Sequence, residues 1–111
     1  MFDFEKLDVY QKAKQINKEV YSFLRNSKTI DSVSKNQLRR ASLSIMLNIA
    51  EGSSRFSKPD RRNFFVISRG SAFECVAVFD FLKDETIMHE EEFKSFYGKV
   101  DELSRMLFIM I

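Results

Sequence analysis

Apolar residues recur at steps of three and four along four stretches of the chain, and this spacing predicts amphipathic helices. In the first stretch Val9, Ala13, Ile16 and Val20 fall on one stripe, while lysines occupy the solvent side. The last stretch repeats the pattern from Phe93 onwards. Turn-forming residues separate the stretches, so we expect helices over 8–25, from about 31 to 52, over 58–84 and over 89–110.

The second and third stretches are apolar on more than one side. A surface helix needs a single apolar face, so two faces predict burial on two sides, one against the helix's own bundle and one against a second subunit or a partner. In the second helix one stripe consists of Leu38, Ala41, Ile45 and Ile49, and the other side carries Leu43, Met46, Leu47 and Ala50. In the third helix we expect an inward seam of Phe64, Ser68, Ser71, Cys75, Val78 and Leu82.

Two helix ends carry specific signals. Gly52 follows the last apolar position of the second helix, and we expect it to stop that helix in the left-handed conformation. Ser57 followed by Asp60, with Pro59 between them, is the pattern of a capped helix start. The third helix should therefore begin near Lys58.

Length and composition agree with long helices in one domain. The chain has 111 residues, a length that supports one hydrophobic core. Hydrophobic residues make up 44% and charged residues 31%, and this composition is that of a folded chain rather than a disordered one. Only three Gly and one Pro leave little room for hairpins. We predict an all-α fold, an up-down-up-down antiparallel four-helix bundle formed by a single domain over residues 1–111. The two apolar sides of the second and third helices also call for a homo-oligomer.

The sequence offers little for a catalytic or metal site. A carboxylate-bridged metal site would need Glu-x-x-His on two helices, and the single histidine, His89, heads the last helix beside three glutamates. Cys75 lies within the apolar third helix without a histidine to act as its base. We therefore predict no enzyme, no metal, no cofactor and no small-molecule substrate. The single cysteine and the absence of a long apolar run predict a soluble, cytoplasmic protein without membrane contact.

Several polar residues fall within the apolar second and third helices. Pairing these helices about their loop places Ser44 opposite Gly70 and Ser71, and Arg40 or Ala41 opposite Glu74. Since buried polar groups need partners, we expect a buried ion pair of Glu74 with Arg40 or Arg39. Hydrogen bonds near the loop complete the predicted structural polar set, which is Arg39, Arg40, Asn48, Glu51 and Glu74.

The strongest functional signal is a basic segment at the turn between the second and third helices. Residues 35–69 hold eight basic and two acidic side chains, a net charge of +6, while the whole chain has +2. Arginines suit phosphate groups, and an aromatic ring among them can stack on an unpaired base. An ordinary solvated helix end would have the same composition. The predicted nucleic-acid contacts, called the basic turn below, are Arg55, Phe56, Lys58, Arg61 and Arg62.

Two motifs in the chain resemble a known family. The run QLRRASLSIMLNIAEG, residues 37–52, and the later Gly70-Ser71-Ala72-Phe73-Glu74 are similar to sequences in the small bacterial proteins encoded by intervening sequences of 23S rRNA genes. The opening FEKLDVYQKA, residues 4–13, is similar too, so the resemblance spans nearly the whole chain. It implies a four-helix bundle and, for the assembly, a pentameric ring.

Two functions follow as expectations from these features. The first is a non-enzymatic homo-oligomer, with a pentamer favoured, that binds RNA or DNA through its basic surface. The second is a protein-interaction module, similar to the bundle accessory proteins thought to support the reverse transcriptase of diversity-generating retroelements. Salt-dependent RNA binding would favour the first, and saturable binding of a protein without nucleic acid would favour the second.

Overall fold

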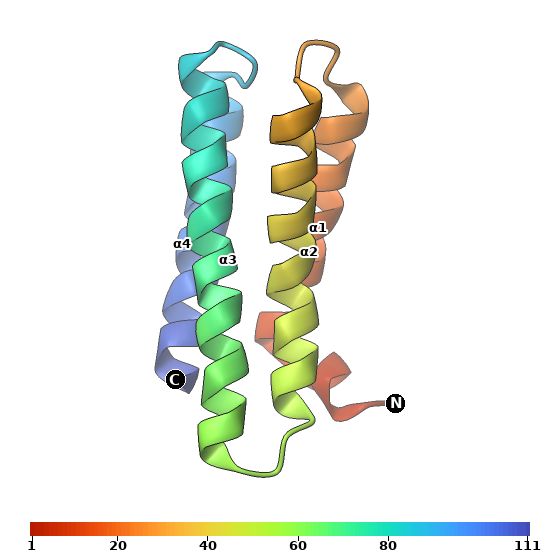
Figure 1. The fold of residues 1–111 in the computed structure, drawn as a ribbon, viewed down its shortest axis with the longest axis vertical. Helices are drawn as coiled ribbons and strands as arrows, with labels where there is room; N and C mark the ends of the chain where they lie inside the picture. Colours follow the sequence, from red (N-terminus) through yellow and green to blue (C-terminus); the bar gives the residue numbers. More distant parts are fainter.

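The computed structural model describes all residues, 1–111, and contains four long helices and no strand. Figure 1 shows two helical hairpins side by side, with both chain ends and the α2–α3 connection at one end of the bundle. This is the predicted up-down-up-down order, in a molecule of 44 × 24 × 21 Å. The elements are a short helix η1 (Asp3–Lys6) and the helices α1 (Asp8–Asn26), α2 (Ser32–Ser53), α3 (Lys58–Asp84) and α4 (Glu90–Met110).

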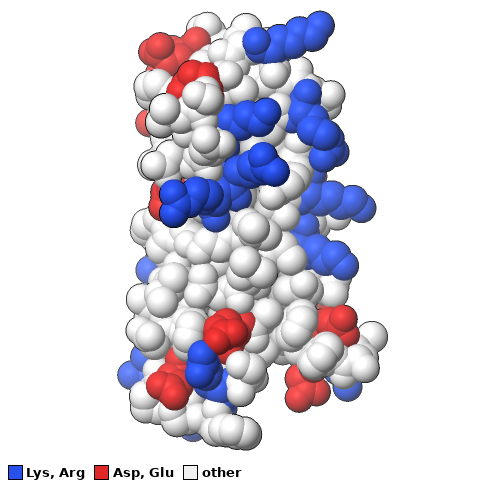
Figure 2. All heavy atoms as spheres, turned by 45° about the vertical axis from the view of Figure 1, so that its right-hand side comes forward, with Lys and Arg blue, Asp and Glu red and all other residues white.

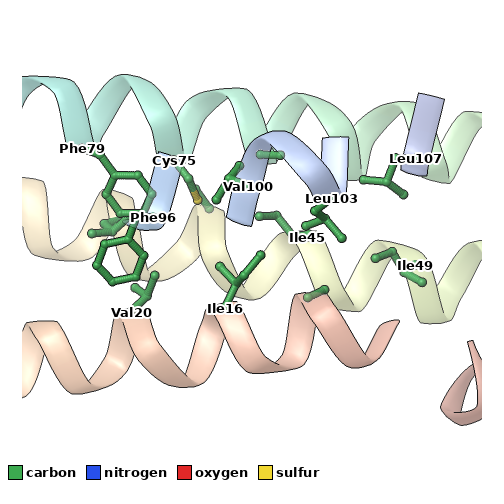
Figure 3. Close-up of a cluster of buried hydrophobic side chains, with 14 of the residues drawn as sticks. Ile16, Val20, Ile45, Ile49, Cys75, Phe79, Phe96, Val100, Leu103 and Leu107 are labelled. Carbon is green, nitrogen blue, oxygen red and sulfur yellow. The ribbon is translucent and has the colours of Figure 1, made fainter. Parts of the chain in front are cut away.

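The core runs the length of the bundle between the four helices (Figure 3). The predicted stripes of α1 and α2 are confirmed, since Val9, Ala13, Ile16 and Val20 are buried and Ile45 is fully enclosed. On these two helices the helical period therefore located the inward face. The stripe of α2 also includes Leu38, Ala41 and Ile49.

The predicted seam of α3 is wrong at three of its six positions. The buried residues there are Phe65, Ala72 and Phe79, each one position later than the predicted Phe64, Ser71 and Val78, whereas Ser68, Cys75 and Leu82 are buried as predicted. Apolar residues flank both alternatives, so periodicity does not separate them. Contact with α4 selects the observed seam, because the ring of Phe79 stacks on the ring of Phe96, with 4.7 Å between the centroids.

The start of α3 is confirmed. The hydroxyl of Ser57 accepts a hydrogen bond from the backbone N–H of Asp60 at 3.2 Å, which caps the helix. At the start of α4, His89 is the residue before the helix, and the Glu92 carboxylate accepts its N–H at 2.9 Å. At the start of α1 Leu7 holds the capping position, and no side-chain hydrogen bond caps this helix.

The expected role of Gly52 is also wrong. It lies inside α2 with helical geometry, and no glycine in the chain has a positive φ. A side chain is excluded there for another reason, because a Cβ atom would lie 2.8 Å from Cε1 of Phe65 and 3.0 Å from Cβ of Phe64. The glycine allows the first turns of α3 to approach α2 closely.

Candidate nucleic-acid interface

The basic turn lies at the end of the bundle where α2 passes into α3, and its first arginine already has partners. Arg55 forms an ion pair with Glu51 one turn earlier in the chain. Its guanidinium also lies over the ring of Phe64, 4.7 Å from the centroid. Both contacts hold Arg55 against the helix end, although its side chain remains 41% exposed.

The two arginines in the first turns of α3 serve the fold. Arg61 donates from Nη1 to the backbone carbonyls of Arg55 and Phe56, at 2.9 Å each, and so fixes the shape of the turn. Arg62 donates from Nε to the carbonyl of Ile111 at 3.0 Å, which ties α3 to the end of α4. Much of their hydrogen-bonding capacity is therefore used within the chain.

The remaining two residues of the basic turn are free. Phe56 is fully exposed, and Lys58 is exposed without a carboxylate partner. The apolar area of this ring gains free energy when a ligand covers it. The structure thus brings the five predicted residues together, but only two of them are uncommitted.

The predicted set of buried polar residues is corrected by the structure. Arg39, Arg40, Glu51 and Glu74 are exposed in the chain, and Asn48 is half-buried. The helix register is the reason, because the inward positions of α2 and α3 are taken by apolar and small side chains. Asn48 bonds within its own helix, donating to the carbonyl and the hydroxyl of Ser44 at 2.9 Å each.

No ion pair joins Glu74 to Arg39 or Arg40. Arg40 and Glu74 nevertheless line one shallow groove of about 400 Å³ on the outside of the α2–α3 hairpin. Ser44 and Ser71 form its floor, where the Ser71 hydroxyl donates to the Ser44 hydroxyl at 2.8 Å. The predicted register of the two helices is therefore right, while the predicted burial is wrong.

A second basic surface lies on α1 and α2, away from the basic turn. On α1, Lys14, Lys18, Tyr21 and Arg25 follow one another at steps of four, three and four, so they share one face. Arg39 of α2 joins this face, with its guanidinium 5.3 Å from the centroid of the Tyr21 ring. Figure 2 shows Lys and Arg side chains gathered over the upper half of this side of the molecule.

The cations of this surface have no carboxylate partners. The five ion pairs of the structure use Lys12, Arg55, Lys83, Lys99 and Arg105. The only acids between residues 13 and 50 are Glu19, which pairs with Lys99 of α4, and Asp31, which caps α2. The surface, called the α1–α2 cationic face below, consists of Lys14, Lys18 and Arg25 of α1 and Lys35 and Arg39 of α2.

Sequence reasoning missed this face because its members come from two separate helices. Two signals would have revealed it, namely the helical spacing of Lys14, Lys18 and Arg25 and the scarcity of acids between residues 13 and 50. Lys12, by contrast, points towards α4. Its pKa is raised by the hydrogen bond and the charge of Glu102, 2.7 Å away.

The side chains that could act in catalysis or bind a metal do not cluster in one place. Burial raises the pKa of the Cys75 thiol to about 12, with a smaller contribution from the charge of Glu74, so the thiol is protonated at neutral pH. No group of three or more His, Cys, Asp or Glu side chains in the structure is placed to hold a metal ion. None of the helices combines the length and the apolar composition that crossing a membrane requires.

Comparison with known proteins identifies the family. The family model of the 23S rRNA-intervening sequence protein matches residues 5–108. A crystal structure of a protein of unknown function from the S23 ribosomal protein family of Bacteroides thetaiotaomicron superposes with a TM-score of 0.86, at 24% identity over 93% of this chain and 97% of that chain. No curated protein matches the chain. Because the family model covers nearly the whole chain, this protein belongs to the 23S rRNA-intervening sequence protein family.

Proposed function

We propose that this protein is a non-enzymatic, self-associating helical bundle that binds RNA or another nucleic acid by its phosphate backbone. The observation that carries the proposal is the α1–α2 cationic face, where five Lys and Arg side chains lie without a carboxylate partner. Like charges held together repel, and a polyanion relieves this repulsion while it releases its counterions.

The dimensions of the face suit a phosphate backbone. Lys14 and Arg25 are eleven residues apart in α1, which spans about 16 Å along the helix. One strand of a duplex carries a charge about every 3.4 Å of its axis, so several phosphates lie within reach of the face. The face lies on the sides of two packed helices, where lysines and arginines can contact a phosphate backbone without entering a groove, so we expect binding that depends little on sequence.

We propose the basic turn as a secondary contact at the other end of the bundle. Phe56 and Lys58 are its uncommitted residues, and the fully exposed ring can stack on an unpaired base. Phe56→Ala should then weaken binding of single-stranded RNA by about 1–3 kcal/mol and leave duplex binding unchanged. Equal effects on both substrates would remove this contact from the proposal.

We further propose that copies of the chain associate through the outer side of the α2–α3 hairpin. The Ser44–Ser71 contact sets a register in which Leu47 lies level with Ile67, at one end of the Arg40–Glu74 groove. At the other end Val33 lies level with Phe81. These four apolar side chains, the α2–α3 apolar face, are exposed in one chain by 68% (Val33), 53% (Leu47), 45% (Ile67) and 50% (Phe81).

The exposed apolar side chains at both ends of this face gain free energy when a second copy covers them. In an assembly, Arg40 of one copy can pair with Glu74 of the next. This gives the unpaired charges of the groove the partner that they lack within one chain. The pentamer implied by the family resemblance is the assembly we propose.

Charge reversal tests the nucleic-acid proposal. Lys18→Glu with Arg25→Glu should weaken binding to structured RNA strongly and lower the slope of log K against log salt by roughly two, since about 0.9 counterion is released per phosphate contact. The matched control is Lys6→Glu with Lys94→Glu, which changes the net charge equally at exposed positions outside the face. Unchanged binding in the first variant, or equal losses in both, would refute the face as the site.

The rival function is a protein-interaction module. The α2–α3 apolar face favours it, because a groove flanked by apolar side chains also fits a different protein. If the protein binds another protein saturably in the absence of nucleic acid, and changes in the α2–α3 apolar face remove this binding while charge reversal does not, the protein-partner function replaces the nucleic-acid function.

A further inference from the structure

A pocket of about 390 Å³ opens between α3 and α4, on a part of the surface that neither the cationic face nor the α2–α3 apolar face includes. Its volume falls within the range of small-molecule sites, about 300–1,000 Å³. Polar and aromatic side chains alternate on its walls. They include Arg69 and Phe73 from α3, and Tyr97, Asp101, Ser104 and Arg105 from α4.

Arg69 is held in the pocket wall by two aromatic rings. Its guanidinium lies 4.7 Å from the ring centroid of Phe73 and 5.3 Å from that of Phe108. Its Nε atom is the only buried side-chain nitrogen or oxygen in the chain without a hydrogen-bond partner. None of the ion pairs of the chain includes this guanidinium either, so the group as a whole lacks an acceptor that a ligand in the pocket can provide.

The chain itself does not supply that acceptor. The nearest candidate, Asp101, forms an ion pair with Arg105 at 3.3 Å. The pocket therefore holds two guanidinium groups and one carboxylate, a net charge of +1 that one further anionic group would neutralise. Ser104, which is 7% exposed, adds a hydroxyl to the same wall.

The apolar part of the pocket points to a flat ligand. Phe73 is 56% exposed and Tyr97 is 49% exposed, so both present ring area that gains free energy when it is covered. We propose that the pocket between α3 and α4 binds a small aromatic carboxylate. Its carboxylate accepts from the guanidinium of Arg69, and its ring lies against Phe73 and Tyr97.

Isothermal titration with 2-naphthoate tests the site on the assembled wild-type protein, with 2-naphthalenemethanol as the neutral probe of the same shape. We expect saturable binding of naphthoate at one site per chain, with the alcohol at least about tenfold weaker, because a hydrogen bond to a charged group adds that much or more. Arg69→Met keeps an apolar side chain between the rings and removes the charge. It should weaken naphthoate at least about tenfold and leave the alcohol unchanged.

Lys58→Met removes the same charge outside the pocket and should leave naphthoate binding unchanged. If Arg69→Met does not fold, Arg69→Lys keeps the charge without the Nε donor and should weaken naphthoate by a smaller factor. No saturable binding, equal affinity for acid and alcohol, or wild-type affinity in the Arg69 variants would overturn the proposal. Because the pocket lies outside the cationic face, RNA binding by these variants reports separately on the proposed function.

Discussion

The hydroxyl of Ser71 donates a hydrogen bond to the hydroxyl of Ser44 across the α2–α3 contact, with 2.8 Å between the oxygens. One turn away, the hydroxyl of Ser68 donates to the carbonyl of Ile45 at 2.8 Å. Small side chains at both positions allow the two helices to approach closely, and their hydroxyls have partners there. These two contacts fix the register that places Arg40 and Glu74 in one groove.

The exposure of Glu74 predicts how its removal affects stability. Glu74→Ala should change the free energy of unfolding of a dissociated chain by less than about 0.5 kcal/mol, because an exposed side chain without a partner contributes little. Urea unfolding in the background Ile67→Lys with Phe81→Lys measures it. Ile45→Ala, a change in the core, serves as the positive control and should cost about 2–5 kcal/mol. If Glu74→Ala lowered the free energy of unfolding by several kcal/mol, the hypothesis of a buried ion pair would stand again.

Gly52 and Gly98 give a matched pair of helical glycines. Gly52→Ala should destabilise the protein by about 1–3 kcal/mol, because its Cβ would overlap the ring of Phe65 at 2.8 Å. The Cβ atom added by Gly98→Ala would have no neighbour within 4 Å. This change should therefore stabilise the protein by about 0.5–1 kcal/mol through helix propensity. Thermal unfolding of both variants measures the contrast, and a stabilising Gly52→Ala would contradict the close approach of α2 and α3.

Cys75 gives the protein a defined response to alkaline pH. Its folded pKa of about 12 lies above the ordinary value of 9.0, so the folded state favours the protonated thiol. The contribution of the protonated thiol to the free energy of unfolding is fully present below pH 9.0 and is lost as the pH rises towards about 12. Unfolding free energies of wild type and Cys75→Ala should therefore converge over this window. A thiol reagent should react with the native protein at pH 8 only as fast as the chain unfolds.

Self-association is predicted to depend on the α2–α3 apolar face. The wild-type protein should elute as a pentamer in chromatography with light scattering. Ile67→Lys with Phe81→Lys should give monomers with unchanged helix content, because both side chains are about half exposed in one chain. Phe56→Lys, at a fully exposed position outside this face, should leave the assembly intact. A monomeric wild type at micromolar concentration would refute the proposed assembly.

The sequence by itself determined the helices and their order. Apolar spacing, the scarcity of Gly and Pro, and the Ser57 cap were sufficient, because each acts within a few neighbouring residues. The pairing of Ser44 with Ser71 followed as well, since a short loop between antiparallel helices leaves little freedom of register. The inward stripe of α1 was also predictable, because only one of its sides is apolar.

Only the tertiary structure decided which side of α3 faces the core. Phe64 and Phe65 are equally apolar, but only Phe65 is buried, and further along α3 the inward face is set by the ring of Phe79, which stacks on Phe96 of α4. The same selection leaves Glu74 outside, and contact with Phe65 makes Gly52 a packing position rather than a helix stop.

The candidate site depended on tertiary structure for the same physical reason. Arg61 and Arg62 look free in the sequence, but the fold brings backbone carbonyls of the turn and of Ile111 within their reach. Arg39, in contrast, comes to lie over Tyr21, which is eighteen positions earlier in the chain. Local patterns fix helices, whereas the partners of long charged side chains are chosen by residues distant in sequence, which only the packed bundle brings together.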